Sequence, residues 1–401
     1  MQMKIGIVSY RMDYYINQRL MLDILPDATY VPVRDWYGFV RRLANKFNRT
    51  LGKPLFPVFN LNNQFEDLDL NRVDLLHFFN GVSYGRTPWV SSFETILPRF
   101  SHLVTRHHGQ EIAHVSADAL TRRGLEALAG RSCLAILPLS QSAAQMQTDL
   151  LKDLPAEYAQ PILDKMRVLH PPQEVLVPEV KAREYSSDNP IRFILVGAAF
   201  FRKGGREVLE VFERLVRQEK LPVRLIIVSS LRIEPYAAKE TEEDVAWAKA
   251  KIAENADWIE YYPELTNVDT LALMRGADVG MLPSYADTYG FSVLEAQACG
   301  LPVITTDIRA LPEVNNPSVG WLIKVPKNAL GEALYATAEE REVLSQSIRA
   351  GLEQSVRHIA ADTGQIAVKG AAALERIRQE HDPTTYANAL RQVYGLAFQK
   401  K

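Results

Sequence analysis

The sequence predicts an α/β protein made of two doubly wound halves, each with a parallel sheet between layers of helices. Short β-branched runs alternate with helical patterns along most of the chain, and this alternation implies parallel sheets covered on both faces. The runs IRFILVG and VRLIIVSS are almost continuously apolar, as central strands buried on both sides should be. A length of 401 residues exceeds one ordinary core, so we expect two domains.

The first half contains five candidate strands and a clear helix at Gln141–Leu151. The strands are Lys4–Ser9, Val73–Phe78, Leu103–Arg106, Leu134–Pro138 and Met166–Leu169. The stretch Pro171–Pro190 has four prolines and no periodicity, which predicts a linker. We therefore place the N-terminal domain at residues 1–180.

The second half repeats the alternation over residues 190–380. Its candidate strands are Ile191–Val196, Val223–Val228, Trp258–Tyr261, Val279–Leu282 and Val303–Thr305. The helical patterns between them are Gly205–Gln218, Val245–Glu254 and Val268–Met274. A final amphipathic helix is predicted at Tyr386–Phe398.

Composition narrows the class of protein. A formal net charge of −2 argues against a general nucleic-acid binder. Cys133 and Cys299 lie in unrelated segments, which indicates a reducing compartment rather than a disulfide framework. No run of 18 apolar residues occurs, so no membrane-spanning helix is predicted, and the N-terminus resembles a buried strand more than a signal peptide. We expect a cytoplasmic protein.

The loop VGAAFFRKGGREVLEVF follows a predicted strand, and ligands of open α/β sheets bind beyond the carboxyl ends of strands. Gly197 ends the strand, and Arg202, Lys203 and Gly204 precede a helix. Glycine allows close backbone approach, and a helix N-terminus favours an anion. A diphosphate would suit this loop, although a left-handed turn with solvated basic residues is an equal alternative.

A second loop and helix read PSYADTYGFSVLEAQACGLPVI, in which Asp287 and Glu295 are the only charges from residue 287 to 301. The neighbours of Glu295 are apolar, so we expect it to be buried. Leaving a buried carboxylate without a partner costs roughly 3–5 kcal/mol, and the helix itself contains no Lys or Arg. Vicinal ribose hydroxyls would match the two oxygens; a basic residue from elsewhere in the fold is the alternative.

These residues resemble the retaining glycosyltransferases of family 4, whose carboxylate–x7–carboxylate motif lies in a characteristic frame. Pro312 and Glu313 continue the resemblance, LVTRHHGQE resembles a strand of the N-terminal lobe that ends in His-Gly, and LPLSQSAAQMQ resembles the next strand and helix. The frame itself reads Pro283, Ser284, Tyr289, Gly290, Leu294, Glu295, Ala296, Gly300, Pro302 and Val303.

The resemblance implies the two-lobed GT-B fold, with the C-terminal helix, residues 384–401, returning to the N-terminal domain. It implies that Glu295 binds the nucleotide ribose, Asp287 the donor sugar and Lys203 the diphosphate. It places His108 at the reaction centre, and it implies neither cofactor nor metal. The other donor-binding candidates are Gly197, Arg202, Gly204, Tyr289, Gly290 and Phe291.

Three features depart from the family pattern. The first carboxylate is Asp287, whereas Glu is commoner in the family, so its side chain is one methylene shorter. Ala198 stands where the family usually has Arg, and Arg202 offers a replacement for its charge. The stretch SYRMDYYIN lacks the Gly-Gly loop of many members, and Arg11 and Asp13 are candidates there for contact with acceptor or phosphate.

The expected activity is transfer of a hexose-type sugar from a nucleoside-diphosphate sugar to a hydroxyl of a sugar, glycan or lipid-linked acceptor. The alternatives are another GT-B activity, such as an epimerase or a phosphorylase, and a catalytically weak nucleotide-binding protein. The helix WYGFVRRLANKFNR, residues 36–49, has an apolar stripe and basic residues without acids. Packing of this stripe on the N-terminal lobe is favoured, and peripheral contact with the inner face of an anionic membrane is the alternative.

Overall fold

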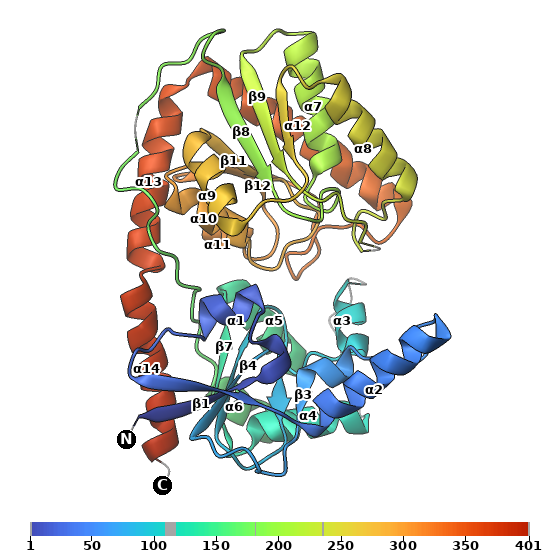
Figure 1. Ribbon diagram of the computed structural model, residues 1–401, viewed down its shortest axis with the longest axis vertical. Coiled ribbons are helices and arrows are strands. Elements are labelled where there is room, and N and C mark those ends of the chain that lie inside the picture. The colour runs from blue at the N-terminus through green and yellow to red at the C-terminus, as the bar shows by residue number, and fades with distance from the viewer. Residues whose placement is uncertain (1, 109–117, 181, 235, 400–401) are drawn as a thin grey trace. The chain divides into compact units, whose positions relative to one another are not determined.

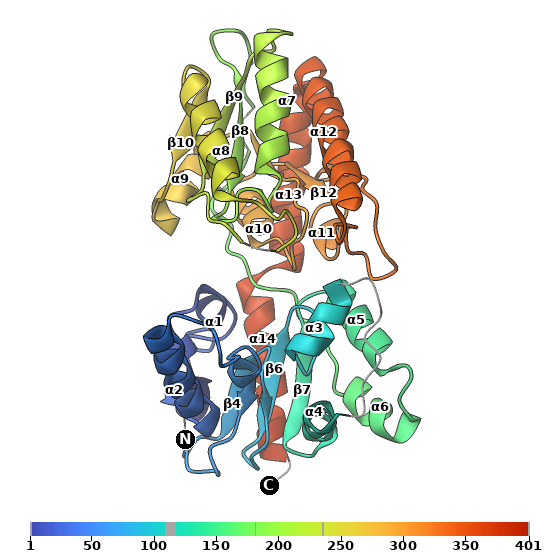
Figure 2. The same cartoon turned by 90° about the vertical axis from the view of Figure 1, so that its right-hand side faces the viewer.

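The computed structural model describes residues 2–108, 118–180, 182–234 and 236–399. The chain divides into two compact units, one formed by Met1–Pro172 with Pro383–Lys401 and the other by Gln173–Asp382. Each unit has a parallel sheet with helices on its faces (Figure 1; Figure 2). The predicted α/β class with two doubly wound sheets is confirmed. No helix in the described ranges is both long and apolar enough to span a bilayer.

The first unit has a sheet in the order β2-β1-β4-β6-β7, all parallel. The strands are β1 (Met3–Val8), β2 (Ala28–Val33), β4 (Leu75–Phe79), β6 (Trp89–Phe93) and β7 (Cys133–Pro138), with a separate pair β3 (Gln64–Phe65) and β5 (Val82–Ser83). The helices are η1 (Ser9–Arg11), α1 (Tyr15–Leu20), α2 (Trp36–Leu51), η2 (Asn60–Asn63), α3 (Ser101–His108), α4 (Ala119–Ala129), α5 (Gln141–Leu151), α6 (Ala156–Leu163) and α14 (Pro383–Gln399).

The second unit has a sheet in the order β10-β9-β8-β11-β12-β13. The strands are β8 (Ile191–Val196), β9 (Val223–Val228), β10 (Ile259–Tyr262), β11 (Val279–Leu282), β12 (Val303–Thr306) and β13 (Gly320–Ile323). The helices are α7 (Gly205–Arg217), α8 (Glu242–Glu254), α9 (Asn267–Gly276), α10 (Phe291–Ala298), α11 (Leu311–Val314), α12 (Ala338–Ala361) and α13 (Gly364–Glu380). All five strands predicted for this half are present within one residue at each end.

Two strand predictions in the first half are wrong. Leu103–Arg106 lies in helix α3, and the strand between β4 and β7 is β6 instead. A run as short as LVTR fits either structure, and only Leu103 of the described side chains in that run is buried, as on a surface helix. Met166–Leu169 runs beside β7 but forms only an isolated bridge from Met166 to Ile136.

Helix α14 completes the core of the first unit, although the whole second unit precedes it in the sequence. The Tyr386 hydroxyl donates to the Leu20 carbonyl at 2.9 Å. The Tyr394 hydroxyl lies 2.7 Å from Nδ1 of His77 on β4, whose Nε2 lies 2.9 Å from the Ser92 hydroxyl on β6. Burial lowers the pKa of His77 to about 3, so this link between α14 and the sheet is neutral.

Candidate functional site

The two loops that the sequence singles out lie side by side in the second unit. Residues 197–204 connect β8 to α7, and residues 283–290 connect β11 to α10. Because β8 and β11 are neighbouring parallel strands, both loops leave the same edge of the sheet. This is the edge where open α/β sheets bind ligands.

The loops are joined through the backbone of Arg202. Its carbonyl accepts hydrogen bonds from the Tyr285 amide at 2.9 Å and from the Ser284 hydroxyl at 3.0 Å. The Ser284 hydroxyl also lies 2.8 Å from the Ala286 carbonyl, and the Arg202 guanidinium donates to that carbonyl at 2.6 Å. Ser284 is fully buried, so the Pro-Ser pair of the motif has a structural role in fixing one loop against the other.

Two glycines allow this close packing. Gly204 caps α7 with φ at +78°, and a Cβ placed there would lie 2.2 Å from the Pro283 carbonyl oxygen. Gly197 has φ at +148°, and a Cβ there would lie 2.3 Å from Cε of Lys203. The aliphatic part of Lys203 therefore lies directly over the backbone of Gly197.

Lys203 and Asp287 form an ion pair across the two loops. Nζ of Lys203 lies 3.2 Å from Oδ2 of Asp287, and the side chains are 15% and 12% exposed. The other carboxylate oxygen of Asp287 accepts from the Tyr289 amide at 3.3 Å. Burial raises the pKa of Asp287, but the charges of Lys203 and Arg202 outweigh it and hold the pKa below its usual value. The Asp287 carboxylate is thus ionised and lies where the two loops meet.

Arg202 is held by a third loop, the one that follows β9. Its Nε donates to Glu234 at 2.8 Å, and Arg232 pairs with the same carboxylate. Burial raises the pKa of Glu234, and the two arginines more than reverse this. Glu234 is a residue that the prediction missed; the sequence offers no signal for it beyond its place in the loop that follows β9. Whether Arg202 also replaces the charge absent at Ala198 stays a prediction.

Gly290 caps the N-terminus of helix α10 with φ at +91°, and the helix carries Glu295. Tyr289 is buried, and its ring centroid lies 5.4 Å from that of Phe291. The expectation that Glu295 is fully buried is wrong, because the residue is half-buried. Position 295 lies opposite the buried face of α10 at 100° per residue; the buried residues are Val293, Leu294, Ala296, Gln297 and Ala298. A role in binding ribose stays a prediction.

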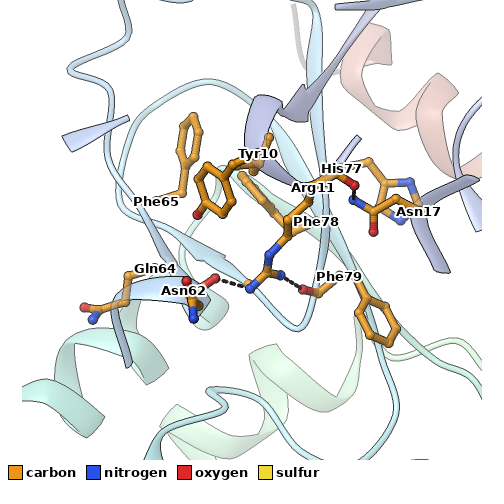
Figure 3. Close-up of a pocket in the computed structure, with 11 residues that line it drawn as sticks. Tyr10, Arg11, Asn17, Asn62, Gln64, Phe65, His77, Phe78 and Phe79 are labelled. Carbon is orange, nitrogen blue, oxygen red and sulfur yellow. Dashed lines mark hydrogen bonds between the residues drawn. The ribbon is translucent and has the colours of Figure 1, made fainter. Parts of the chain in front are cut away.

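The candidates in the first unit are less closely grouped. Arg11 lies in a small pocket of about 10 Å³ (Figure 3). Its guanidinium donates to the Phe79 carbonyl at 2.6 Å and to the Asn62 carbonyl, and burial lowers its pKa. Arg11 thus ties the end of β4 to η2, while Asp13 is exposed. The His108 side chain lies outside the described residues, so its predicted role stays untested.

Comparisons with known proteins point to one class of enzyme. Residues 178–353 match the family model described as glycosyl transferases group 1. The O-antigen chain mannosyltransferase B of Escherichia coli is 26% identical over 30% of this chain and 30% of its own length. The glycogen synthase of Mycobacterium tuberculosis is 26% identical over 51% of this chain and 42% of its own length. The chain therefore spans less than half the length of these curated relatives.

A solved structure extends the similarity to nearly the whole chain. The Anabaena protein HepE, determined in complex with UDP, matches with a TM-score of 0.58 over 98% of this chain and 99% of that one, at 13% identity. Identity this low supports the fold alone, and the expected GT-B fold is confirmed.

Proposed function

Residues 178–353 match the glycosyl transferases group 1 family model, and from this premise we propose that the chain is a nucleotide-sugar-dependent glycosyltransferase. The protein moves a sugar, of the hexose type, from a nucleoside-diphosphate sugar to an acceptor hydroxyl and retains the anomeric configuration. The observation that carries the proposal is the Lys203–Asp287 pair, 3.2 Å apart at the start of α7. A cation, a helix N-terminus and an ionised carboxylate together match a sugar attached to a diphosphate.

The chemistry follows from where charge develops. The bond between the anomeric carbon and the diphosphate oxygen breaks, a bond to the acceptor oxygen forms, and nucleoside diphosphate and a proton are released. Negative charge grows on the diphosphate, and preorganised cations and amides stabilise that charge most in the transition state. Lys203 and the amides that begin α7 take this role. Asp287 accepts hydrogen bonds from the donor sugar hydroxyls.

Glu295 extends the donor site along α10. Its half-buried side chain carries a carboxylate that can accept hydrogen bonds from both ribose hydroxyls, and Tyr289, Gly290 and Phe291 lie where the same helix begins. That HepE was determined with UDP supports a nucleoside diphosphate as the ligand. We propose that no cofactor or metal is needed, since Lys203 and the helix N-terminus supply the positive charge.

The remaining features of the proposal concern acceptor and location. The acceptor is a sugar, a glycan or a lipid-linked saccharide. Both cysteines are free and buried, which suits a reducing cytoplasm. Contact of residues 36–49 with the inner face of a membrane depends on which way that helix directs its apolar side chains.

A thermal-shift panel of nucleoside diphosphates and their sugars tests the proposal, because a ligand of the folded state raises the melting temperature. Glu295→Ala should lose the shift and the transfer activity while keeping its fold. Glu254→Ala is the matched control, since that carboxylate is 62% exposed on α8 and should change neither. Conversion of the donor sugar without loss of nucleotide would identify an epimerase, and a shift without turnover would identify a binding protein. Either outcome, or full activity of Glu295→Ala, contradicts the proposal.

A further inference from the structure

Helix α2 lies at the periphery of the first unit (Figure 1; Figure 2), and its large apolar side chains are exposed. Six large apolar side chains on it are between 42% and 55% exposed: Trp36, Phe39, Val40, Leu43, Phe47 and Leu51. Their spacing of three and four residues places them on one face of the helix. The expectation that this stripe packs on the N-terminal domain is therefore wrong.

The helix contacts its own unit through a different face. Gly38 and Ala44 are buried, and Tyr37, Arg41 and Asn48 are half-buried. A Cβ at Gly38 would lie 2.5 Å from the Asp35 carboxylate, which caps the helix through the Gly38 amide at 2.9 Å. The unit thus holds α2 by small and polar residues, and burial of the large apolar ones is not needed to keep the helix in place.

The exposed apolar surface continues past the end of the helix. The Asn48 side chain accepts from the Phe56 amide and donates to its carbonyl, each at 2.9 Å. This fixes the following loop against the helix, and the Phe47 and Phe56 rings lie 6.1 Å apart. Leu55 and Phe56 are 60% and 48% exposed. A surface of this kind on a soluble monomer commonly marks a binding site for another molecule.

The charged residues within this segment have one sign. Residues 36–65 contain five basic residues and no Asp or Glu; the basic residues are Arg41, Arg42, Lys46, Arg49 and Lys53. Arg42, Lys46 and Arg49 are exposed, and at 100° per residue they border one side of the apolar stripe. An apolar face beside a band of cations complements a surface with an apolar interior and anionic headgroups.

We propose that α2 and the loop through Phe56 dock on an anionic lipid bilayer. The apolar side chains enter the boundary between headgroups and acyl chains, and the basic side chains remain among the headgroups. The docking itself goes beyond the proposed function. One consequence rests on that function: an enzyme held in this way would draw its acceptor from the bilayer, which favours the lipid-linked class.

Vesicle flotation of the full-length protein tests the docking. The wild type should float with vesicles that contain phosphatidylglycerol, more weakly at high salt, and hardly at all with phosphatidylcholine alone. Leu43→Glu places a carboxylate in the centre of the apolar stripe. Asn45→Glu is the matched control, because it adds the same charge to an exposed position that lies about 200° around the same helix from Leu43.

Added negative charge alone should weaken binding by about fivefold in both variants. Leu43→Glu should lose roughly tenfold more, because insertion of its face is prevented. Absence of flotation by the wild type, or equal losses in the two variants, would overturn the proposal. Light scattering that finds a dimer broken by Leu43→Glu, without vesicle binding, would assign the face to a second copy and overturn it as well. The thermal shift with nucleoside diphosphates should remain in Leu43→Glu, so failure of the docking is distinguishable from failure of the proposed function.

Discussion

Substitution of Gly204 by alanine measures how tightly the two site loops depend on each other. Gly204 has φ at +78°, and the added Cβ would lie 2.2 Å from the Pro283 carbonyl oxygen. Gly331 is a matched control in the same unit, with φ at +76° and no closer contact than 3.6 Å, to the Arg309 amide nitrogen. The two alanine variants share the backbone strain and differ in the collision.

The expected magnitudes follow from these two terms. A left-handed conformation costs an L-residue about 1–2 kcal/mol, so Gly331→Ala should lower the free energy of unfolding by that amount. The overlap at Gly204 involves backbone rather than a flexible side chain, so the loop at Pro283 must move. Overpacking of this kind costs about 1–3 kcal/mol more. Gly204→Ala should therefore lose about 2–5 kcal/mol in total.

Urea denaturation followed by tryptophan fluorescence provides the assay, since Trp247, Trp258 and Trp321 report on the second unit. The nucleoside-diphosphate thermal shift, measured on the same samples, should fall in Gly204→Ala and persist in Gly331→Ala. Equal stability of the two variants, within about 0.5 kcal/mol, would refute the inferred contact between the loops.

Two further predictions concern pH. Burial raises the pKa of Glu207, and hydrogen bonds from Ser345 and Tyr285 offset this only partly. The contribution of Glu207 to stability is therefore present below its pKa in the unfolded state, about 4.3. It is lost as the pH rises through the pKa in the folded state. Between about pH 5 and 8, the stability of Glu207→Gln should therefore fall less than that of the wild type. Urea midpoints measured at both pH values test this, and a larger fall in the variant would contradict it. The pKa of Asp287 is lowered instead, so its contribution is present above an unfolded value of about 3.9 and is lost as the pH falls through the folded pKa. Asp287→Asn should flatten the acid limb of the stability profile below about pH 4, and an unchanged acid limb would argue against the ion pair with Lys203.

The second sheet could be predicted from the sequence because its central strands are buried on both faces and consist of apolar residues. The same rule failed at β6, where WVSSF contains two serines. Ser91 and Ser92 are nevertheless buried, and Ser92 meets His77 at 2.9 Å. A polar contact between neighbouring strands hides such a strand from any search for apolar runs.

The site residues in the second unit could be predicted because they follow strand ends. The ion pairs that they form with one another could not. Lys203 and Asp287 are 84 residues apart and meet only because β8 and β11 are neighbours in the sheet. The same holds for Arg202 and Glu234, which approach through the neighbouring strands β8 and β9. Periodicity also identified the apolar stripe on α2, but it did not show that the stripe faces away from the unit. The small size of Gly38 and Ala44 determines which face of α2 packs on the unit.

The position of α14 has a consequence for the order in which the protein can fold during synthesis. The sheet of the first unit is translated early, yet Tyr386 and Tyr394, which close over Leu20 and His77, leave the ribosome only after the second unit. The second unit, Gln173–Asp382, is contiguous and has all its partners when its last residue emerges. During synthesis the second unit should therefore complete its fold first. The core of the first unit should stay incompletely covered until residues 383–399 have been made.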